Sequence, residues 1–198
     1  GLATLVPTTI AFFCAYYFDN KSILSLAITG LAAYIGLSVS PQSLLNNSFY
    51  ETTTLSYSAI ILGIALVIWS ICSAKINLKK HFNLIYLTFA LHLISISCIK
   101  NLFNSYWVLF ALLLIASSYY FFTTSHQIKS ASLFIFTIIY AYVGINICLF
   151  KLVEFINFDS DLLVPFFFLV PFYFIGSIIL FILLVKKFNK DKTYDTIR

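Results

Sequence analysis

The sequence predicts an all-α fold: a polytopic transmembrane helical bundle of about seven spans, with its N-terminus outside the cell and its C-terminus in the cytoplasm. The first observation is composition. Of 198 residues, 61% are hydrophobic and 10% are charged, whereas about a quarter of the residues in a soluble domain are charged. The others are seven separated apolar runs and an uneven distribution of basic residues. A small soluble domain leaves much of its surface exposed, so this chain is expected to lie mostly in lipid.

Each apolar run is close to the length that a membrane-spanning helix requires, which is about 20 residues with a range of about 17–25. The runs are continuously apolar, which excludes the strands of a membrane barrel because those alternate. We expect a transmembrane bundle over residues 1–185 and a basic cytoplasmic tail over 186–198. The expected spans are residues 2–18, 22–39, 54–73, 84–99, 106–122, 131–150 and 162–185.

Polar connections separate the runs. Residues 19–21 predict a tight helical hairpin, with Ser22 as the N-cap of the second helix. The stretch PQSLLNNSFYETT begins at Pro41 and is rich in Asn, Ser and Thr, which predicts a loop over residues 41–53. Asp161 is expected to cap the last helix. The other connections are basic at 73–83, short at 100–105, polar at 123–130 and acidic at 151–161.

Basic residues predict the orientation. Only two of the twelve, Lys100 and Lys151, fall in connections that the seven-span topology places outside. The ten on the other side are Lys21, Lys75, Lys79, Lys80, Lys129, Lys186, Lys187, Lys190, Lys192 and Arg198. Cytoplasmic connections carry an excess of Lys and Arg, so the tail is expected in the cytoplasm. This distribution argues against nucleic-acid binding and favours anionic lipid headgroups as partners at the cytoplasmic face.

The beginning of the chain predicts a missing segment. The sequence contains no methionine and opens GLATLVPTT without a basic region, so it is not an intact signal peptide. We expect residue 1 not to be the natural start, and an outside residue 1 requires a further span if the full protein begins in the cytoplasm. The expected protein partners are that preceding segment of the same protein and a second copy of the chain.

The stretch YYFDNKSILSLAITGLAAYIGLSVSP, residues 16–41, resembles a family of bacterial membrane proteins catalogued as domain of unknown function 2157. The resemblance rests on the YFD turn, the SLAITGLAA helix and the exit GLSVSP. It covers about an eighth of the chain. It implies a multi-pass protein of the bacterial inner membrane with a segment before residue 1, and it implies no activity.

The same stretch places small residues at helical spacing, at Ser25, Thr29, Ala32 and Gly36. Lipid offers no hydrophobic drive for helix association, so small residues that permit close approach predict a packing surface. Pro171, inside the last run, predicts a helix kink.

Polar side chains at mid-membrane depth are the candidate functional residues. His92 shares a helical face with Thr88 and Ser95, and the later spans can bring further polar groups to its level. The complete candidate set is Thr88, His92, Ser95, Tyr140, Tyr142, Asn146 and Tyr173. One hypothesis makes these residues interhelical hydrogen-bond partners. The other makes them the lining of a site for a proton or a small solute, as intramembrane ionisable groups often are.

No enzyme motif appears in the chain, and no Asp, Glu, Lys or Arg lies inside a predicted span. The four cysteines lack metal-ligand spacing, so we expect neither a metal nor a cofactor. An intramembrane enzyme using Ser95 or Ser97 with His92 is the third hypothesis. The function that the sequence favours is a membrane module with a structural, assembly or sensing role, and the alternative is a small-solute or proton-linked transporter.

Overall fold

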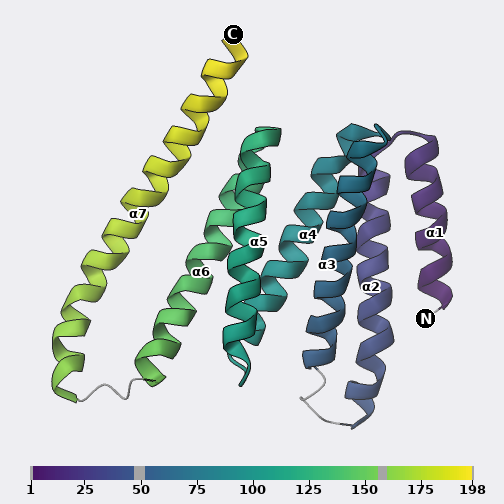
Figure 1. The fold of residues 1–198 in the computed structure, drawn as a ribbon. Helices are drawn as coiled ribbons and strands as arrows, with labels where there is room; N and C mark the ends of the chain where they lie inside the picture. The colour runs from purple at the N-terminus through teal and green to yellow at the C-terminus, as the bar shows by residue number, and fades with distance from the viewer. Residues whose placement is uncertain (1, 47–51, 156–159, 198) are drawn as a thin grey trace. The chain divides into compact units, whose positions relative to one another are not determined.

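The computed structural model describes residues 2–46, 52–155 and 160–197, and within these ranges the chain is helical apart from short turns. The all-α prediction is therefore confirmed. The helices are α1 (Leu2–Tyr17), α2 (Lys21–Asn46), α3 (Thr52–Lys75), α4 (Asn83–Asn101), α5 (Trp107–Ile128), α6 (Ala131–Phe155) and α7 (Ser160–Ile197), with a short 3-10 turn η2 (Lys80–Phe82) before α4 (Figure 1).

Five of the described helical segments are long and apolar enough to cross a membrane. They are Thr54–Lys75, Lys80–Asn101, Trp107–Ile128, Ala131–Glu154 and Phe168–Lys190. The segments Ala3–Tyr17 and Lys21–Gly36 are apolar but shorter. The full count of seven spans, and the orientation, stay predictions.

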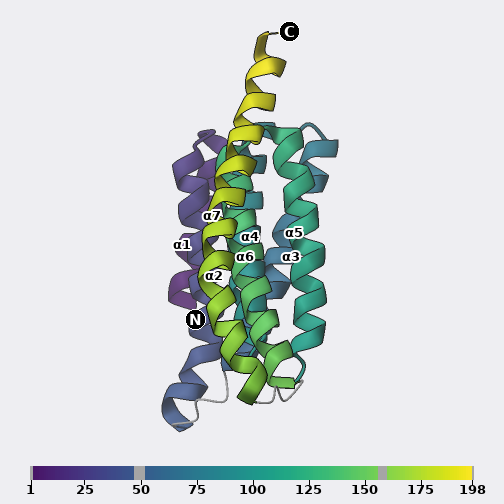
Figure 2. The same cartoon turned by 90° about the vertical axis from the view of Figure 1, so that its left-hand side faces the viewer.

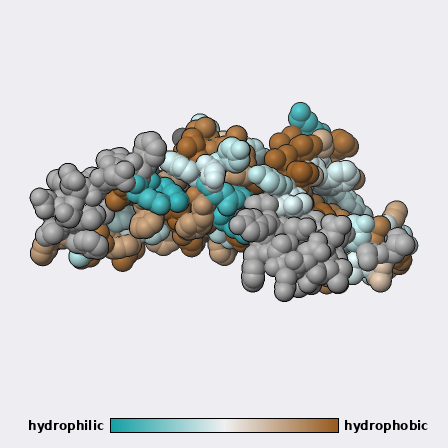
Figure 3. Space-filling view, turned by 90° about the horizontal axis from the view of Figure 1, so that it is seen from below, coloured by the Kyte–Doolittle hydropathy of each residue, from teal (hydrophilic) through white to brown (hydrophobic). Residues whose placement is uncertain are grey.

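The described helices expose many large apolar side chains. Phe13 on α1 and Phe172 on α7 are each 74% exposed, and large exposed apolar residues occur on every helix. In a view along the helices, apolar residues cover much of the drawn surface that is not grey (Figure 3). Soluble monomers rarely expose apolar surface on this scale, because it drives association in water.

The helix ends differ from the prediction in several places. The N-cap of α2 is Asn20 and not Ser22, because the Asn20 Oδ1 atom accepts hydrogen bonds from the backbone N–H groups of Ser22 (2.8 Å) and Ile23 (3.2 Å). The predicted loop at 41–53 begins too early, since α2 continues through Pro41 to Asn46. Likewise α5 includes most of the polar stretch 123–130, and α7 extends far beyond residue 185. The predicted cap at Asp161 falls among side chains that the structure does not describe.

The chain divides into two compact units, residues 1–117 and 118–198. In the first unit α1 packs against α2, α3 packs against α4, and α2 also contacts α3 and α4. Two glycines lie at close approaches between helices. A Cβ atom at Gly30 would lie 2.6 Å from the Thr8 Oγ1 atom, and one at Gly63 would lie 2.6 Å from the Ile94 Cγ1 atom. The first unit is therefore two helical hairpins joined through α2.

In the second unit a ring cluster fixes α7 near its C-terminal end. Phe134 on α6 stacks on Phe188 of α7 at a centroid distance of 4.2 Å. The His126 ring meets both rings edge-on, at 5.2 Å and 5.0 Å. Figure 2 shows α7 as one long continuous helix. It remains helical through Pro171, and the predicted kink there stays a prediction.

Candidate functional site

The most prominent feature of the first unit is an apolar groove of about 630 Å³ flanked by α1 and α3. Its walls come from α1 between Thr9 and Tyr16 and from α3 between Leu62 and Trp69. Leu31 of α2 also lines it. The two walls run in the same direction, because residues 16 and 69 meet at one end. The groove volume falls in the range of about 300–1,000 Å³ that is typical of small-molecule sites.

Three aromatic side chains line one end of the groove, and we call them the aromatic trio: Tyr16, Trp69 and Tyr86. The two phenol oxygens lie 2.7 Å apart in a hydrogen bond, and the Trp69 Nε1–H group donates to the Tyr16 oxygen at 3.0 Å. Tyr86 is only 1% exposed, whereas Trp69 is 51% exposed. The trio joins α1, α3 and α4 through hydrogen bonds between side chains.

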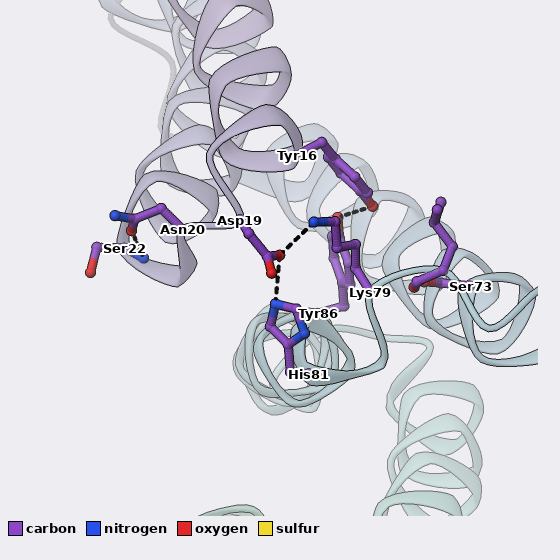
Figure 4. A network of polar contacts seen from close by, with 9 residues as sticks. Tyr16, Asp19, Asn20, Ser22, Ser73, Lys79, His81 and Tyr86 are labelled. Atoms are coloured by element: carbon purple, nitrogen blue, oxygen red, sulfur yellow. Dashed lines mark hydrogen bonds and ion pairs between the residues drawn. The ribbon is translucent and has the colours of Figure 1, made fainter.

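An ion-pair cluster lies just beyond the trio, and we call it the Asp19 clasp: Asp19, Lys79 and His81 (Figure 4). One carboxylate oxygen of Asp19 is 2.9 Å from the Lys79 ammonium nitrogen and 2.9 Å from the His81 Nε2 atom. The hydrogen bond from Lys79 and the positive charges of Lys79 and protonated His81 hold the pKa of the Asp19 carboxyl below its usual range. The clasp ties the α1–α2 turn to the α3–α4 connection.

Backbone geometry explains how the turns present these residues. Asp19 adopts a left-handed conformation with φ 54°, and Asn20 N–H bonds back to the Ala15 carbonyl at 3.1 Å. Asn77 has φ 58° after α3, and Leu78 N–H bonds to the Ser73 carbonyl at 3.0 Å. Both are Schellman ends, in which a left-handed residue lets later N–H groups satisfy the last helical carbonyls. Asp and Asn tolerate this conformation better than most residues.

Lys79 also adopts the left-handed conformation, which is less favourable for lysine than for Asp or Asn. Its φ of 48° and ψ of 52° lie in the left-handed region, which costs an L-residue about 1 kcal/mol or more. The Lys79–Asp19 contact therefore joins two residues that both depart from ordinary backbone geometry.

The three predicted site residues on α4 lie in the first unit. The Thr88 hydroxyl donates to the Leu84 carbonyl of its own helix at 2.7 Å. Ser95 is 1% exposed, and its Oγ atom has no hydrogen-bond partner among the described residues. His92 is half-buried. None of the three lines the apolar groove.

The four remaining candidates lie in the second unit, on α6 and α7. The Tyr142 hydroxyl lies 3.1 Å from the Ser177 hydroxyl, and the rings of Tyr142 and Tyr173 are stacked at 6.5 Å. The Asn146 amide donates to the Tyr142 carbonyl at 2.7 Å, and Tyr140 is half-buried. The structure thus brings Tyr142 of α6 to Tyr173 of α7, whereas Asn146 bonds within its own helix. Their convergence with His92, which belongs to the other unit, stays a prediction.

The predicted packing stripe on α2 lies on partly exposed surface. Ser25, Ala32 and Gly36 are of intermediate exposure, and Thr29 is exposed. The hydroxyls of Ser25 and Thr29 bond to carbonyls of their own helix, at 3.1 Å and 2.9 Å. The buried face of α2 instead carries Leu24, Ala27 and Ile28. Whether the stripe packs against another chain is a separate prediction.

The aromatic trio and the Asp19 clasp were not predicted as a site. The sequence does predict that Tyr16, Trp69 and Tyr86 lie at the same membrane interface, as aromatic belt residues. A common depth in the membrane is compatible with hydrogen bonds among the three side chains, because Tyr O–H and Trp N–H groups usually find partners when buried. Their distances depend on how α1 packs beside α3, which no local pattern gives.

Among the described residues, no three His, Cys, Asp or Glu side chains gather as metal ligands. Comparison of the chain with protein-family models, with curated proteins and with solved structures gives no match. A function for this chain is therefore inferred from the geometry of the groove, the aromatic trio and the Asp19 clasp.

Proposed function

We propose that this chain is a multi-pass integral protein of the bacterial inner membrane, with seven spans and a cytoplasmic tail, that serves as a membrane module with a structural, assembly or sensing role. The five long apolar helices and the exposed apolar residues support membrane insertion. The bias of ten basic residues to one side supports the orientation. The resemblance of residues 16–41 to domain of unknown function 2157 supports the bacterial inner membrane.

One observation favours a structural role over a transport role. The groove of the first unit is lined mainly by apolar and aromatic side chains, and none of the three predicted polar residues of that unit, Thr88, His92 and Ser95, lines it. Thr88 and Asn146 bond to carbonyls of their own helices, so these polar groups are already paired. A transport path needs polar groups that face a hydrated cavity, as intramembrane sites for ions and protons do.

A small-solute or proton-linked transporter is the alternative. It is favoured by the buried Ser95 hydroxyl, which lies one helical turn from His92 and has no partner among the described residues. It is also favoured by the polar group formed by Tyr142, Asn146, Tyr173 and Ser177 in the second unit.

Reconstitution of the full chain into liposomes tests these proposals. Resistance to alkaline extraction measures insertion, and an enclosed pH-sensitive dye measures proton movement under an imposed gradient. We expect an alkali-resistant protein and a proton flux equal to that of protein-free liposomes. A flux that disappears in His92→Ala but persists in His126→Ala would put transport first. Full release by alkali would overturn membrane insertion itself.

A further inference from the structure

The groove between α1 and α3 is long enough for part of a lipid chain. Each wall extends over eight residues, or seven residue steps, from Thr9 to Tyr16 and from Leu62 to Trp69. At 1.5 Å of rise per residue this is about 10 Å, or about two thirds of one leaflet of a 30 Å hydrocarbon layer. The lining between these ends is apolar, with residues such as Phe12, Ala65 and Leu66. An occupant of this part must be apolar and elongated.

The end of the groove that the aromatic trio lines holds a hydrogen-bond donor that the trio itself does not use. The trio has three polar protons: two phenol O–H groups and the Trp69 N–H group. Trp69 donates to Tyr16, and one phenol donates to the other. Whichever phenol donates, the remaining O–H proton is left for a partner outside the trio. An acceptor atom of an occupant can therefore be held where the apolar lining ends.

Positive charge dominates the same end of the first unit. The α1–α2 and α3–α4 connections carry Lys21, Lys75, Lys79 and Lys80 against the single acidic residue Asp19. Asp19 pairs with Lys79 and His81, so its charge is compensated within the clasp. Lys21, Lys75 and Lys80 are exposed. Basic side chains at a membrane surface attract anionic headgroups.

We infer that this groove binds one acyl chain of an anionic phospholipid, whose headgroup is held by the aromatic trio and by the lysines of the two adjoining turns. The inference rests on the proposed membrane insertion. A neutral apolar molecule would leave the spare phenol donor and the lysines unused. A soluble anion would leave the apolar walls exposed. A phospholipid of the surrounding leaflet has an apolar chain for the groove walls and, at the end of that chain, an anionic headgroup for the phenol donor and the lysines.

Native mass spectrometry of the full chain, released from micelles containing equal amounts of phosphatidylglycerol and phosphatidylcholine, tests the site. Ala65→Phe fills the groove, and Ala33→Phe makes the same change at an exposed alanine of α2 outside it. We expect the wild type and Ala33→Phe to retain phosphatidylglycerol in preference to phosphatidylcholine. Ala65→Phe is expected to lose the retained lipid about tenfold or more, because the added ring occupies the volume of the chain.

A second pair of variants tests the headgroup. Lys75→Gln with Lys80→Gln removes two charges at the groove end, and Lys100→Gln with Lys151→Gln removes two from connections elsewhere. We expect only the first pair to abolish the preference for phosphatidylglycerol.

Three results would overturn the inference. The first is that Ala65→Phe retains as much lipid as the wild type, and the second is that the wild type retains both lipids equally. The third is a dimer that Ala65→Phe converts to monomer, which would assign the groove to a second copy of the chain. Failure of the proposed membrane insertion is distinguishable, since the chain would then not co-float with liposomes of either lipid.

Discussion

The hydroxyl of Tyr16 lies 2.7 Å from the hydroxyl of Tyr86, and this single hydrogen bond joins α1 to α4 across 70 residues of sequence. Trp69 of α3 donates to the same Tyr16 oxygen. Four residues further along the chain than Tyr86, Ala90 lies against Gly63, where α3 and α4 are in close contact. The first unit therefore combines a tight α3–α4 contact with a polar joint that links α1 to α3 and α4, while α1 itself packs against α2.

Tyr86→Phe is expected to lower the free energy of unfolding by about 0.6–1.5 kcal/mol, because it keeps the buried ring and removes one interhelical hydrogen bond. Unfolding in increasing dodecyl sulfate, followed by circular dichroism, measures the change. Tyr119→Phe is the matched control, since Tyr119 is 74% exposed. An equal effect of the two substitutions would show that the trio does not stabilise the fold.

Acid is expected to release the Asp19 clasp. The pKa of Asp19 is lowered in the folded state, so its stabilising contribution is complete above the ordinary aspartate value of about 3.9 and is lost as pH falls through the lower folded value. Fluorescence of Trp69 in a Trp107→Phe, His81→Gln background, which removes the other titrating partner of Asp19, should stay constant from about pH 8 to pH 5 and change only below about pH 4. Asp19→Asn should abolish this change. An unaltered acid transition in Asp19→Asn would assign it to another group.

Gly63→Ala is expected to destabilise the first unit by about 1–3 kcal/mol, because overpacking a tight contact displaces neighbouring atoms. A Cβ atom there would lie 2.6 Å from Ile94 Cγ1 and 3.3 Å from the Ala90 carbonyl oxygen. Gly176→Ala is the control, since nothing lies within 4 Å of its added Cβ. That variant should gain up to about 1 kcal/mol from helix propensity. Equal midpoints of unfolding in the two variants would contradict the close α3–α4 contact.

Ser95→Ala is expected to leave stability unchanged or to raise it by up to about 1 kcal/mol, because the buried hydroxyl has no partner among the described residues. Ser73→Ala is the contrasting variant. The Ser73 hydroxyl donates to the Leu78 carbonyl at 2.5 Å, and its loss should cost about 0.5–1.5 kcal/mol. A large loss of stability in Ser95→Ala would show that this hydroxyl has a bonding role.

The helices could be predicted because long apolar runs determine them locally. The expected spans 2–18 and 84–99 match α1 and α4 within two residues at each end. Polar composition was a poor guide to where helices stop. Residues 123–127 are polar and lie in α5, where the side chains of Thr123, Ser125 and His126 bond to carbonyls of their own helix. Pro41 is likewise tolerated within α2.

The candidate site was less predictable because it depends on contacts between helices. The sequence marks His92 as an ionisable residue in an apolar run, whereas Asp19 lies in a predicted turn, where a charged residue is ordinary. Its partners Lys79 and His81 are 60 and 62 residues away, and they come within 2.9 Å only through the packing of the two hairpins. Helical periodicity places residues on a face, and it gives no information about which turns meet.

The most direct test of the membrane topology is cysteine accessibility in intact cells, on a background in which Cys14, Cys72, Cys98 and Cys148 are replaced by serine. Ile76→Cys lies in the α3–α4 connection and Phe103→Cys lies between α4 and α5, and both positions are well exposed. With a membrane-impermeant maleimide, we predict labelling of Phe103→Cys from outside and labelling of Ile76→Cys only after the membrane is permeabilised. Labelling of Ile76→Cys in intact cells, or of both positions from the same side, would contradict the proposed topology.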